Sequence, residues 1–333
     1  MADREVSQTV TFSEEHVFDQ APGGCVVATL LERLHAELDN WRERLPPAWR
    51  KHFDDIALDF GAVDPRCELT PSERIWPQGN SPNKAARLFK ALNDLRPDQV
   101  RVVIFGNDPY TKLVQATGRS FEQGDLINWA QDIRIRGHIS PSMQSIVAAA
   151  AATDKNNARY SLCDTRMLYD EPEATKEPTA SQIQAQPIWF AHVELARALA
   201  DGAAQLPPPT QIFGHWAKQG VLWLNRTLTY TKWDAVHRTS HRELWAPFTA
   251  RTLEVLVQQG NKHPIVFVMW GASAQQLEPK IRKLATDFKI DRAAIRCCKT
   301  GHPQWVVDYF KSGNPLVAIN EAIAKSGKTI VWK

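Results

Sequence analysis

The chain has 333 residues, of which 43% are hydrophobic and 23% are charged, a composition typical of a folded globular protein. Its 40 Lys and Arg residues outnumber 37 Asp and Glu residues, and a net charge of +3 neither requires nor excludes a nucleic-acid partner. No apolar run is long enough to span a membrane, and the charged start Met1–Glu5 predicts no signal peptide. Five cysteines without C-x-x-C spacing favour unpaired thiols in a reducing compartment over a disulfide framework or a metal site. We therefore expect a cytoplasmic protein that needs no metal or other cofactor.

The N-terminal part combines a polar start with two helical patterns. Residues 1–30, which contain Pro22-Gly23-Gly24, are predicted to be a poorly ordered lead-in. Apolar residues at helical spacing predict helices over residues 29–44 and 81–95, and prolines follow both.

Four apolar runs predict the strands of a sheet, at residues 100–105, 221–224, 265–270 and 294–298. Helical patterns accompany them at residues 187–204, 243–259, 273–288 and 314–326. This alternation predicts an α/β fold with three layers, α/β/α, around a short, four-stranded, mostly parallel sheet. We expect a single domain over residues 31–333, with surface insertions near residues 122–141 and 151–200.

A polar or glycine-containing turn follows each predicted strand. These turns are Gly106–Tyr110, Asn225–Thr227, Gly271–Ser273 and Gly301–Pro303. Each turn alone is weak evidence, because Asn and Asp form ordinary turns and a single His is more often structural than catalytic. Because the carboxyl ends of parallel strands meet at one edge of a sheet, we expect any site to lie there.

The four turns, in this order, resemble the motifs of the family 1 uracil-DNA glycosylases. Gly106-Asn107-Asp108-Pro109-Tyr110 is similar to the family's G-Q-D-P-Y, and the stretch from Trp216 to Asn225 is similar to W-A-K-Q-G-V-L-L-L-N. Val268–Gly271 resembles L-L-W-G, and His302 with Pro303 falls where the family has H-P-S-P. The resemblance runs discontinuously from about residue 40 to the end, and it implies a member of the superfamily that is divergent and carries insertions.

The resemblance implies a DNA repair enzyme that flips uracil out of DNA and hydrolyses its N-glycosidic bond. The products are free uracil and an abasic site, the first step of base excision repair. A carboxylate has to stabilise the cationic sugar and orient the water, a role that falls to Asp108, and His302 would donate to uracil O2. Phe121 matches the position that stacks on the flipped base, and Asn225 matches the amide that reads the base edge. Tyr110 matches the aromatic residue that excludes the thymine methyl group.

Several positions depart from the family pattern. Asn107 replaces the glutamine beside the uracil pocket, and Thr111 replaces the histidine after Tyr110. Of the serines that contact phosphates, Ser142 is retained, whereas Ala272 replaces another and Ser273 stands one position later.

The run after Pro303 is Gln304-Trp305-Val306-Val307, in place of the family's S-P-L-S. Val306 therefore stands at the position of the leucine that fills the gap left by the flipped base. We hypothesise that Trp305 shares or takes over this wedge, because an aromatic face can stack on a neighbouring base. The alternative is that Trp305 packs beneath its loop and never meets DNA.

The expected partners are uracil-containing DNA and the abasic product, with no membrane, and the protein is expected to be a monomer, associated with the nucleoid if bacterial. Two other functions stay open. The fold could serve to bind damaged or abasic DNA with little turnover, which the loss of phosphate-contacting serines favours. It could also serve a glycosylase with another base preference, which the Asn107 change permits.

Overall fold

In the computed structural model of this protein, four strands of five or six residues form the central sheet. They are β3 (Val102–Gly106), β4 (Val221–Asn225), β5 (Ile265–Trp270) and β6 (Ile295–Thr300). All neighbouring strands are parallel, in the order β4-β3-β5-β6, and Gly106 pairs with Asn225 at the end of the β3–β4 register. Every residue of β3, β4 and β5 is buried, as expected for a parallel sheet covered on both faces. The predicted α/β class and the four-stranded parallel sheet are thus confirmed.

The structure describes residues 28–69, 88–132, 135, 137–151, 153, 205–324 and 327–333. The predicted lead-in at 1–30, except its last three residues, lies outside this part of the chain. So do the predicted helix at 187–204 and most of the insertion near 151–200.

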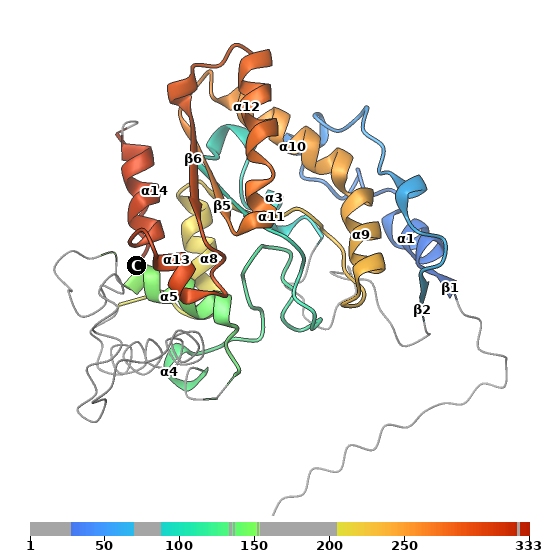
Figure 1. Ribbon diagram of the computed structural model, residues 1–333, viewed down its shortest axis with the longest axis horizontal. Helices are drawn as coiled ribbons and strands as arrows, with labels where there is room; N and C mark the ends of the chain where they lie inside the picture. The colour runs from blue at the N-terminus through green and yellow to red at the C-terminus, as the bar shows by residue number, and fades with distance from the viewer. Residues whose placement is uncertain are drawn as a thin grey trace, which may run out of the picture.

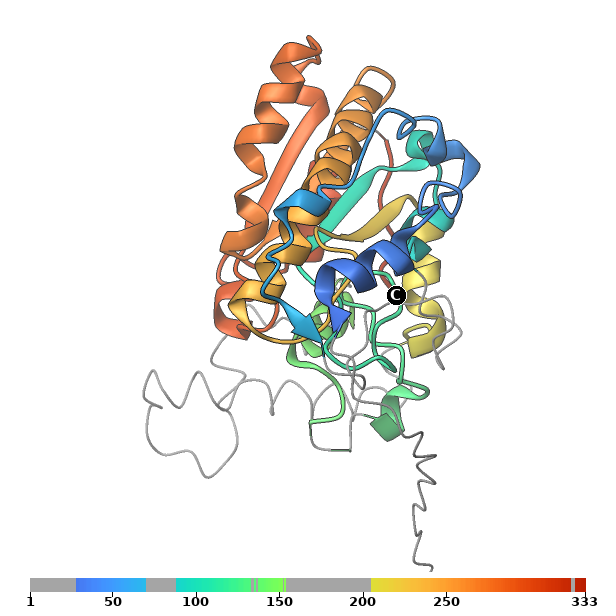
Figure 2. The same ribbon diagram turned by 90° about the vertical axis from the view of Figure 1, so that its right-hand side faces the viewer.

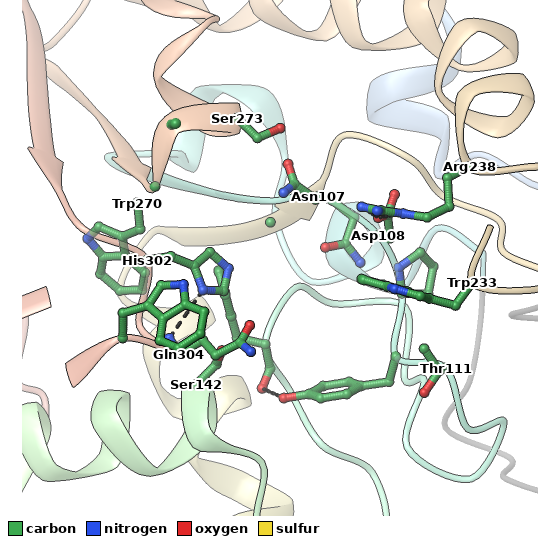
Figure 3. Close-up of a pocket in the computed structure, with 18 residues that line it drawn as sticks. Asn107, Asp108, Thr111, Ser142, Trp233, Arg238, Trp270, Ser273, His302 and Gln304 are labelled. Atoms are coloured by element: carbon green, nitrogen blue, oxygen red, sulfur yellow. Dashed lines mark hydrogen bonds and ion pairs between the residues drawn. The ribbon is translucent and has the colours of Figure 1, made fainter. Parts of the chain in front are cut away.

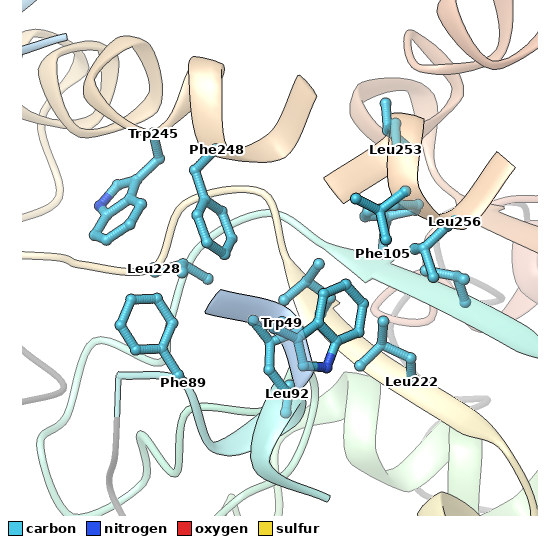
Figure 4. Close-up of a cluster of buried hydrophobic side chains, with 14 of the residues drawn as sticks. Trp49, Phe89, Leu92, Phe105, Leu222, Leu228, Trp245, Phe248, Leu253 and Leu256 are labelled. Carbon is cyan, nitrogen blue, oxygen red and sulfur yellow. The ribbon is translucent and has the colours of Figure 1, made fainter. Parts of the chain in front are cut away.

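Alternate strand residues pack into two separate hydrophobic clusters, one on each face of the sheet. One cluster joins Phe105 and Leu222 to the helices α10 (Ala246–Gln259) and α12 (Glu278–Asp287) and to the N-terminal segment (Figure 4). That segment holds α1 (Leu30–Leu38) and α2 (Pro47–Arg50), whose Trp49 indole donates to Leu95 O at 2.6 Å.

The other cluster joins the remaining strand residues, such as Ile104 and Trp223, to a second set of helices. This set comprises α5 (Pro141–Ala151), α8 (Pro209–Lys218) and α14 (Pro315–Ala324). Figures 1 and 2 show helices on both sides of the sheet, which gives the three predicted layers. Because both faces are covered, a cavity for a ligand is left to the edges of the sheet.

The remaining elements are short, apart from one helix. They are β1 (Ala28–Thr29) paired with β2 (Glu68–Leu69), the helices α3 (Lys90–Asn93), α4 (Trp129–Asp132), α9 (Ala235–Leu244), α11 (Ala272–Gln275) and α13 (Val306–Phe310), and three 3-10 turns at residues 60–62, 97–99 and 292–294. Within the described residues, no helix is long and apolar enough to cross a membrane.

Several helix boundaries differ from the predictions. The helix predicted over 29–44 ends at Leu38, because Asp39 leaves the helical conformation with ψ 135° and Asn40 follows in a left-handed conformation with φ 55°. The helix predicted over 81–95 is limited, among described residues, to α3. The patterns at 243–259 and 273–288 each divide into two helices, at Trp245 and at residues 276–277. The helices α5 and α8, and most of α9, were not predicted.

The strand order has a topological switch point between β3 and β5, because the chain adds strands first on one side of β3 and then on the other. The chain runs from β3 to β4 on one side and then returns past β3 to β5 on the other. The connections therefore diverge at the carboxyl ends of β3 and β5, and this divergence opens a crevice in open α/β sheets.

Candidate active site

A cavity of about 430 Å³ opens at the carboxyl ends of the strands (Figure 3). Its lining comes from the segments that follow β3, β4, β5 and β6, together with the start of α5 and the region before and within α9. Nine of the ten site residues predicted from the sequence line it: Asn107, Asp108, Tyr110, Phe121, Ser142, Asn225, Ser273, His302 and Trp305. The tenth, Val306, does not. The fold thus brings together residues separated by almost 200 positions in the chain.

Asp108 lies in the turn after β3, which backbone hydrogen bonds to the β4 side hold in place. The amides of Arg226 and Thr227 donate to the carbonyl oxygens of Gly106 and Asn107, over 3.0 and 2.9 Å. The Asp108 side chain is only 13% exposed and forms an ion pair with Arg238 of α9 at 2.8 Å. A negative charge is therefore fixed in the wall of the cavity, and within the described residues Arg238 is the cation bound to it.

Asn225 ends β4, and the whole residue is 4% exposed. Its side-chain amide forms no hydrogen bond to any described residue, although a buried amide without partners is costly. Gly106 leaves space for the Asn225 side chain, because a Cβ atom on residue 106 would overlap Asn225 Oδ1 and lie 2.7 Å from Ser120 Cβ. The site thus holds a buried donor–acceptor group whose hydrogen bonds are available to a ligand.

Phe121 has a left-handed backbone with φ 62°, which is uncommon for a bulky residue and concentrates at functional sites. The preceding residue, Ser120, is tied to the sheet by bonds to Trp223 O and Ile104 O, both at 3.2 Å. The Phe121 ring packs against Trp270 and His302 at centroid distances of 5.7 and 5.8 Å. An aromatic ring is therefore held in the cavity wall by a strained but well-anchored loop.

Tyr110 forms the neighbouring part of the wall. Its hydroxyl donates to Phe121 O at 3.1 Å and lies 2.7 Å from Ser140 Oγ. Burial raises the pKa of Tyr110 well above its usual value, so the phenol stays neutral. The ring is consequently fixed at its far end and cannot swing away from the cavity.

One hydrogen bond and burial together favour a neutral His302 with a defined tautomer. The backbone amide of Gln304 donates to His302 Nδ1 at 3.1 Å, shown as a dashed line in Figure 3. Burial lowers the pKa of His302, which favours the uncharged ring. Since Nδ1 accepts, the proton of the neutral imidazole resides on Nε2, and His302 can donate a hydrogen bond from that atom.

The segment after His302 corrects the sequence prediction for the wedge. Trp305 is 54% exposed and lines the cavity, so it does not pack beneath its loop. Val306 is 7% exposed and belongs to the hydrophobic cluster of α5, α8 and α14. The reason is helical geometry: Val306 begins α13 and faces the core, whereas Trp305 precedes the helix and faces outward. Of these two residues, only Trp305 is exposed at the cavity.

The two predicted serines occupy different surroundings. Ser142 lies in the first turn of α5 and is partly buried in the cavity wall. Ser273 accepts a hydrogen bond from Arg226 Nη1 at 3.0 Å, and its carbonyl oxygen accepts from the same nitrogen at 2.6 Å.

Two residues of the site were missed by sequence reasoning, Arg238 and Trp233. Arg238 pairs with an aspartate 130 positions away, and its guanidinium carbon lies 4.1 Å from the centre of the Trp233 ring. Trp233 is 66% exposed and lines the cavity (Figure 3). No local pattern marks this pair, since only the packing of α9 against the strand ends brings it to Asp108.

The fold and the site together define an α/β protein with a carboxylate, a histidine and aromatic rings around one cavity at the carboxyl ends of its parallel strands. The model of the uracil DNA glycosylase superfamily matches residues 93–324, more than half of the chain, and the protein belongs to this superfamily. A uracil-DNA glycosylase of Azobacteroides pseudotrichonymphae is 24% identical over 295 residues, which cover 88% of this chain and 96% of that protein. One from Francisella tularensis is 25% identical over 237 residues, which cover 71% and 74%.

Solved structures show the same fold. The wild-type UNG of Nitratifractor salsuginis superposes with a TM-score of 0.52 at 18% identity, covering 84% of this chain and 92% of that one. The mimivirus uracil-DNA glycosylase gives a TM-score of 0.50 at 19% identity, covering 92% and 93%. These structures support the four-stranded α/β/α architecture described above.

Proposed function

We propose that the protein is a DNA glycosylase that removes uracil from DNA. The observation that carries this proposal is the buried Asn225, whose amide has no hydrogen-bond partner among the described residues and which lines the same cavity as Phe121 and Asp108. An amide can pair with both N3–H and O4 of uracil, and the ring can stack on the base. A flipped nucleotide of this kind satisfies the hydrogen bonds that Asn225 lacks in the protein alone.

The reaction requires a water molecule and no other co-reactant. The bond between C1′ and N1 breaks, and its electron pair leaves with the uracil ring, where O2 carries part of the negative charge. The sugar becomes cationic, and the Asp108 carboxylate stabilises it electrostatically. The water oxygen then bonds to C1′ and its proton passes through the carboxylate to solvent, while the uracil anion takes up a proton from solvent.

His302 would stabilise the departing base. Its Nε2–H group is the free donor of a neutral ring and can hydrogen-bond to uracil O2 as negative charge develops there. A donor that is already neutral and oriented needs no rearrangement during the reaction.

Tyr110 would restrict the base to one without a 5-methyl group. Its ring lies in the cavity wall and is held by Phe121 O and Ser140, so it cannot move aside for thymine. The curated relatives named above are themselves uracil-DNA glycosylases, which agrees with this choice of base.

The test uses oligonucleotides that contain uracil, hypoxanthine or thymine, in single and double strands, with the released base measured directly. We expect release of uracil only. The Asp108→Asn variant should lose turnover by roughly two orders of magnitude or more, because the charge acts in the transition state, and should still bind the DNA. Release of hypoxanthine instead would show another base preference, and binding without release of any base would show a DNA-binding protein.

A further inference from the structure

A second, smaller cavity of about 200 Å³ lies beside the first and is lined by three arginines. It shares Asn107, Asp108, Arg238 and Ser273 with the main cavity, and Arg226 and Arg242 belong to it alone. Of its charged lining residues, only Asp108 is negative. Since Arg238 is paired with Asp108, Arg226 and Arg242 have no counter-charge within the lining of this cavity.

Arg226 is anchored by Ser273 and forms no ion pair with a carboxylate in the described part of the chain. It follows β4 directly, and its Nη1 donates to the carbonyl and hydroxyl oxygens of Ser273. Among the described residues, its Nε and Nη2 have no hydrogen-bond partner. Burial lowers the pKa of Arg226, and the positive charge of Arg242 lowers it further. The half-buried guanidinium of Arg226 is thus held in place, and its Nε and Nη2 can donate hydrogen bonds to a ligand.

Arg242 reaches the same cavity from α9. It stands four positions after Arg238, so both lie on one face of the helix. Its Nε bonds to the exposed carboxylate of Glu243 at 3.1 Å, an ion pair that water screens strongly. Like charges at this spacing destabilise a helix, and a bound anion would relieve the repulsion.

We infer that Arg226 and Arg242, with Ser273 as the anchor of Arg226, bind a phosphodiester of the DNA strand next to the flipped nucleotide. This inference rests on the proposed function. Asp108 lines both cavities, so a sugar placed against it in the main cavity has its own phosphate within reach of the smaller one. A guanidinium group can donate two hydrogen bonds to the oxygens of one phosphate. These two arginines would therefore bind the DNA backbone at a site where Ala272 replaces a phosphate-contacting serine.

The experiment measures the affinity of the full chain for uracil-containing oligonucleotides in which single phosphates beside the uracil are replaced by neutral methylphosphonates. We expect one such replacement to weaken binding about tenfold in the wild type, and to have no further effect in Arg226→Gln or Arg242→Gln. The slope of log affinity against log salt should fall by about one in each variant. Arg242 is half exposed, so its variant keeps the test valid if Arg226→Gln fails to fold.

The control variant is Arg292→Gln, an exposed arginine before β6, at the opposite end of the strand from the site. It should keep the wild-type response to every methylphosphonate. If all methylphosphonates act equally in wild type and variants, the phosphate site is wrong. If inorganic phosphate raises the melting temperature of the wild type but not of the variants, while methylphosphonates act equally in all, the cavity takes a free anion and the inference is also wrong.

Base release separates this inference from the proposed function. Release of uracil without the methylphosphonate effect overturns the phosphate site alone. The methylphosphonate effect without release of any base supports the phosphate site and overturns the glycosylase. Failure to bind DNA at all overturns both.

Discussion

Arg238 donates from both Nε and Nη2 to one oxygen of Asp108, Oδ2, over 3.1 and 2.8 Å. The other oxygen, Oδ1, has no hydrogen-bond partner among the described residues. The guanidinium is itself held against the Trp233 ring, with its carbon 4.1 Å from the ring centre. One oxygen of the carboxylate is therefore fixed, and the other remains available to the sugar or the water.

We expect Arg238 to act as a positioning residue for Asp108. We expect Arg238→Met to lower turnover at saturating DNA by about 10- to 100-fold, because small displacements of a catalytic group have effects of this size. Arg238→Gln, which keeps a donor for Oδ2, should recover part of the loss. Single-turnover rates measure the effect, with Arg251→Met, which breaks an ion pair with Asp55 away from the cavity, as the control. Faster turnover in Arg238→Met would show instead that the cation opposes the charge on the sugar.

The base specificity is expected to depend on Asn225 and Tyr110. Asn225→Asp presents acceptors where the amide offered a donor, so it should admit cytosine. Tyr110→Ala should admit thymine by opening space for the methyl group, whereas Tyr110→Phe keeps the ring and should not. The measurement is free base released from duplexes that carry each base. The pocket assignment fails if neither of the first two variants releases its new base.

Trp305 is expected to hold the strand open after the base has been flipped. Base–aromatic stacking contributes roughly 1–3 kcal/mol, so Trp305→Ala should weaken binding to abasic-site DNA about 5- to 150-fold. Its 54% exposure predicts little loss of thermal stability. Val306→Ala is the matched control, because that buried side chain should lower the melting temperature and leave the affinity unchanged. Equal abasic-site affinities in wild type and Trp305→Ala would exclude the wedge.

Acid should destabilise the fold through His241, which is buried between two threonine hydroxyls. Its Nδ1 and Nε2 lie 2.8 and 3.0 Å from Thr229 Oγ1 and Thr231 Oγ1, and burial lowers its pKa to about 3. Between pH 6.5 and about 3, His241 binds a proton in the unfolded chain but not in the folded chain. The free energy of unfolding therefore rises with pH in that window.

The expected contribution of His241 is on the order of 1 kcal/mol of unfolding free energy lost per pH unit on acidification. Urea unfolding at a series of pH values measures it. His241→Gln can still bond to the threonines but does not titrate, so its stability should depend less steeply on pH. A variant with the same pH dependence as the wild type would show that other groups dominate.

The sequence by itself determined the sheet and most of the site. The strands were predictable because a parallel sheet covered on both faces requires continuous apolar runs, such as Ile265–Trp270. The turns after them were predictable as site positions because parallel strands end at one edge. The helix boundaries were less predictable, since the backbone conformations of two residues, Asp39 and Asn40, end a helix whose apolar spacing continues.

Only the tertiary structure decided which of two sequence neighbours faces the cavity, and which cations from distant parts of the chain lie beside it. Trp305 and Val306 are adjacent in sequence, and the start of α13 turns one outward and the other into the core. Arg226, Arg238 and Arg242 have no motif, because their convergence depends on how α9 packs against the strand ends. Local patterns record what a segment buries, whereas long-range packing determines which charges come together.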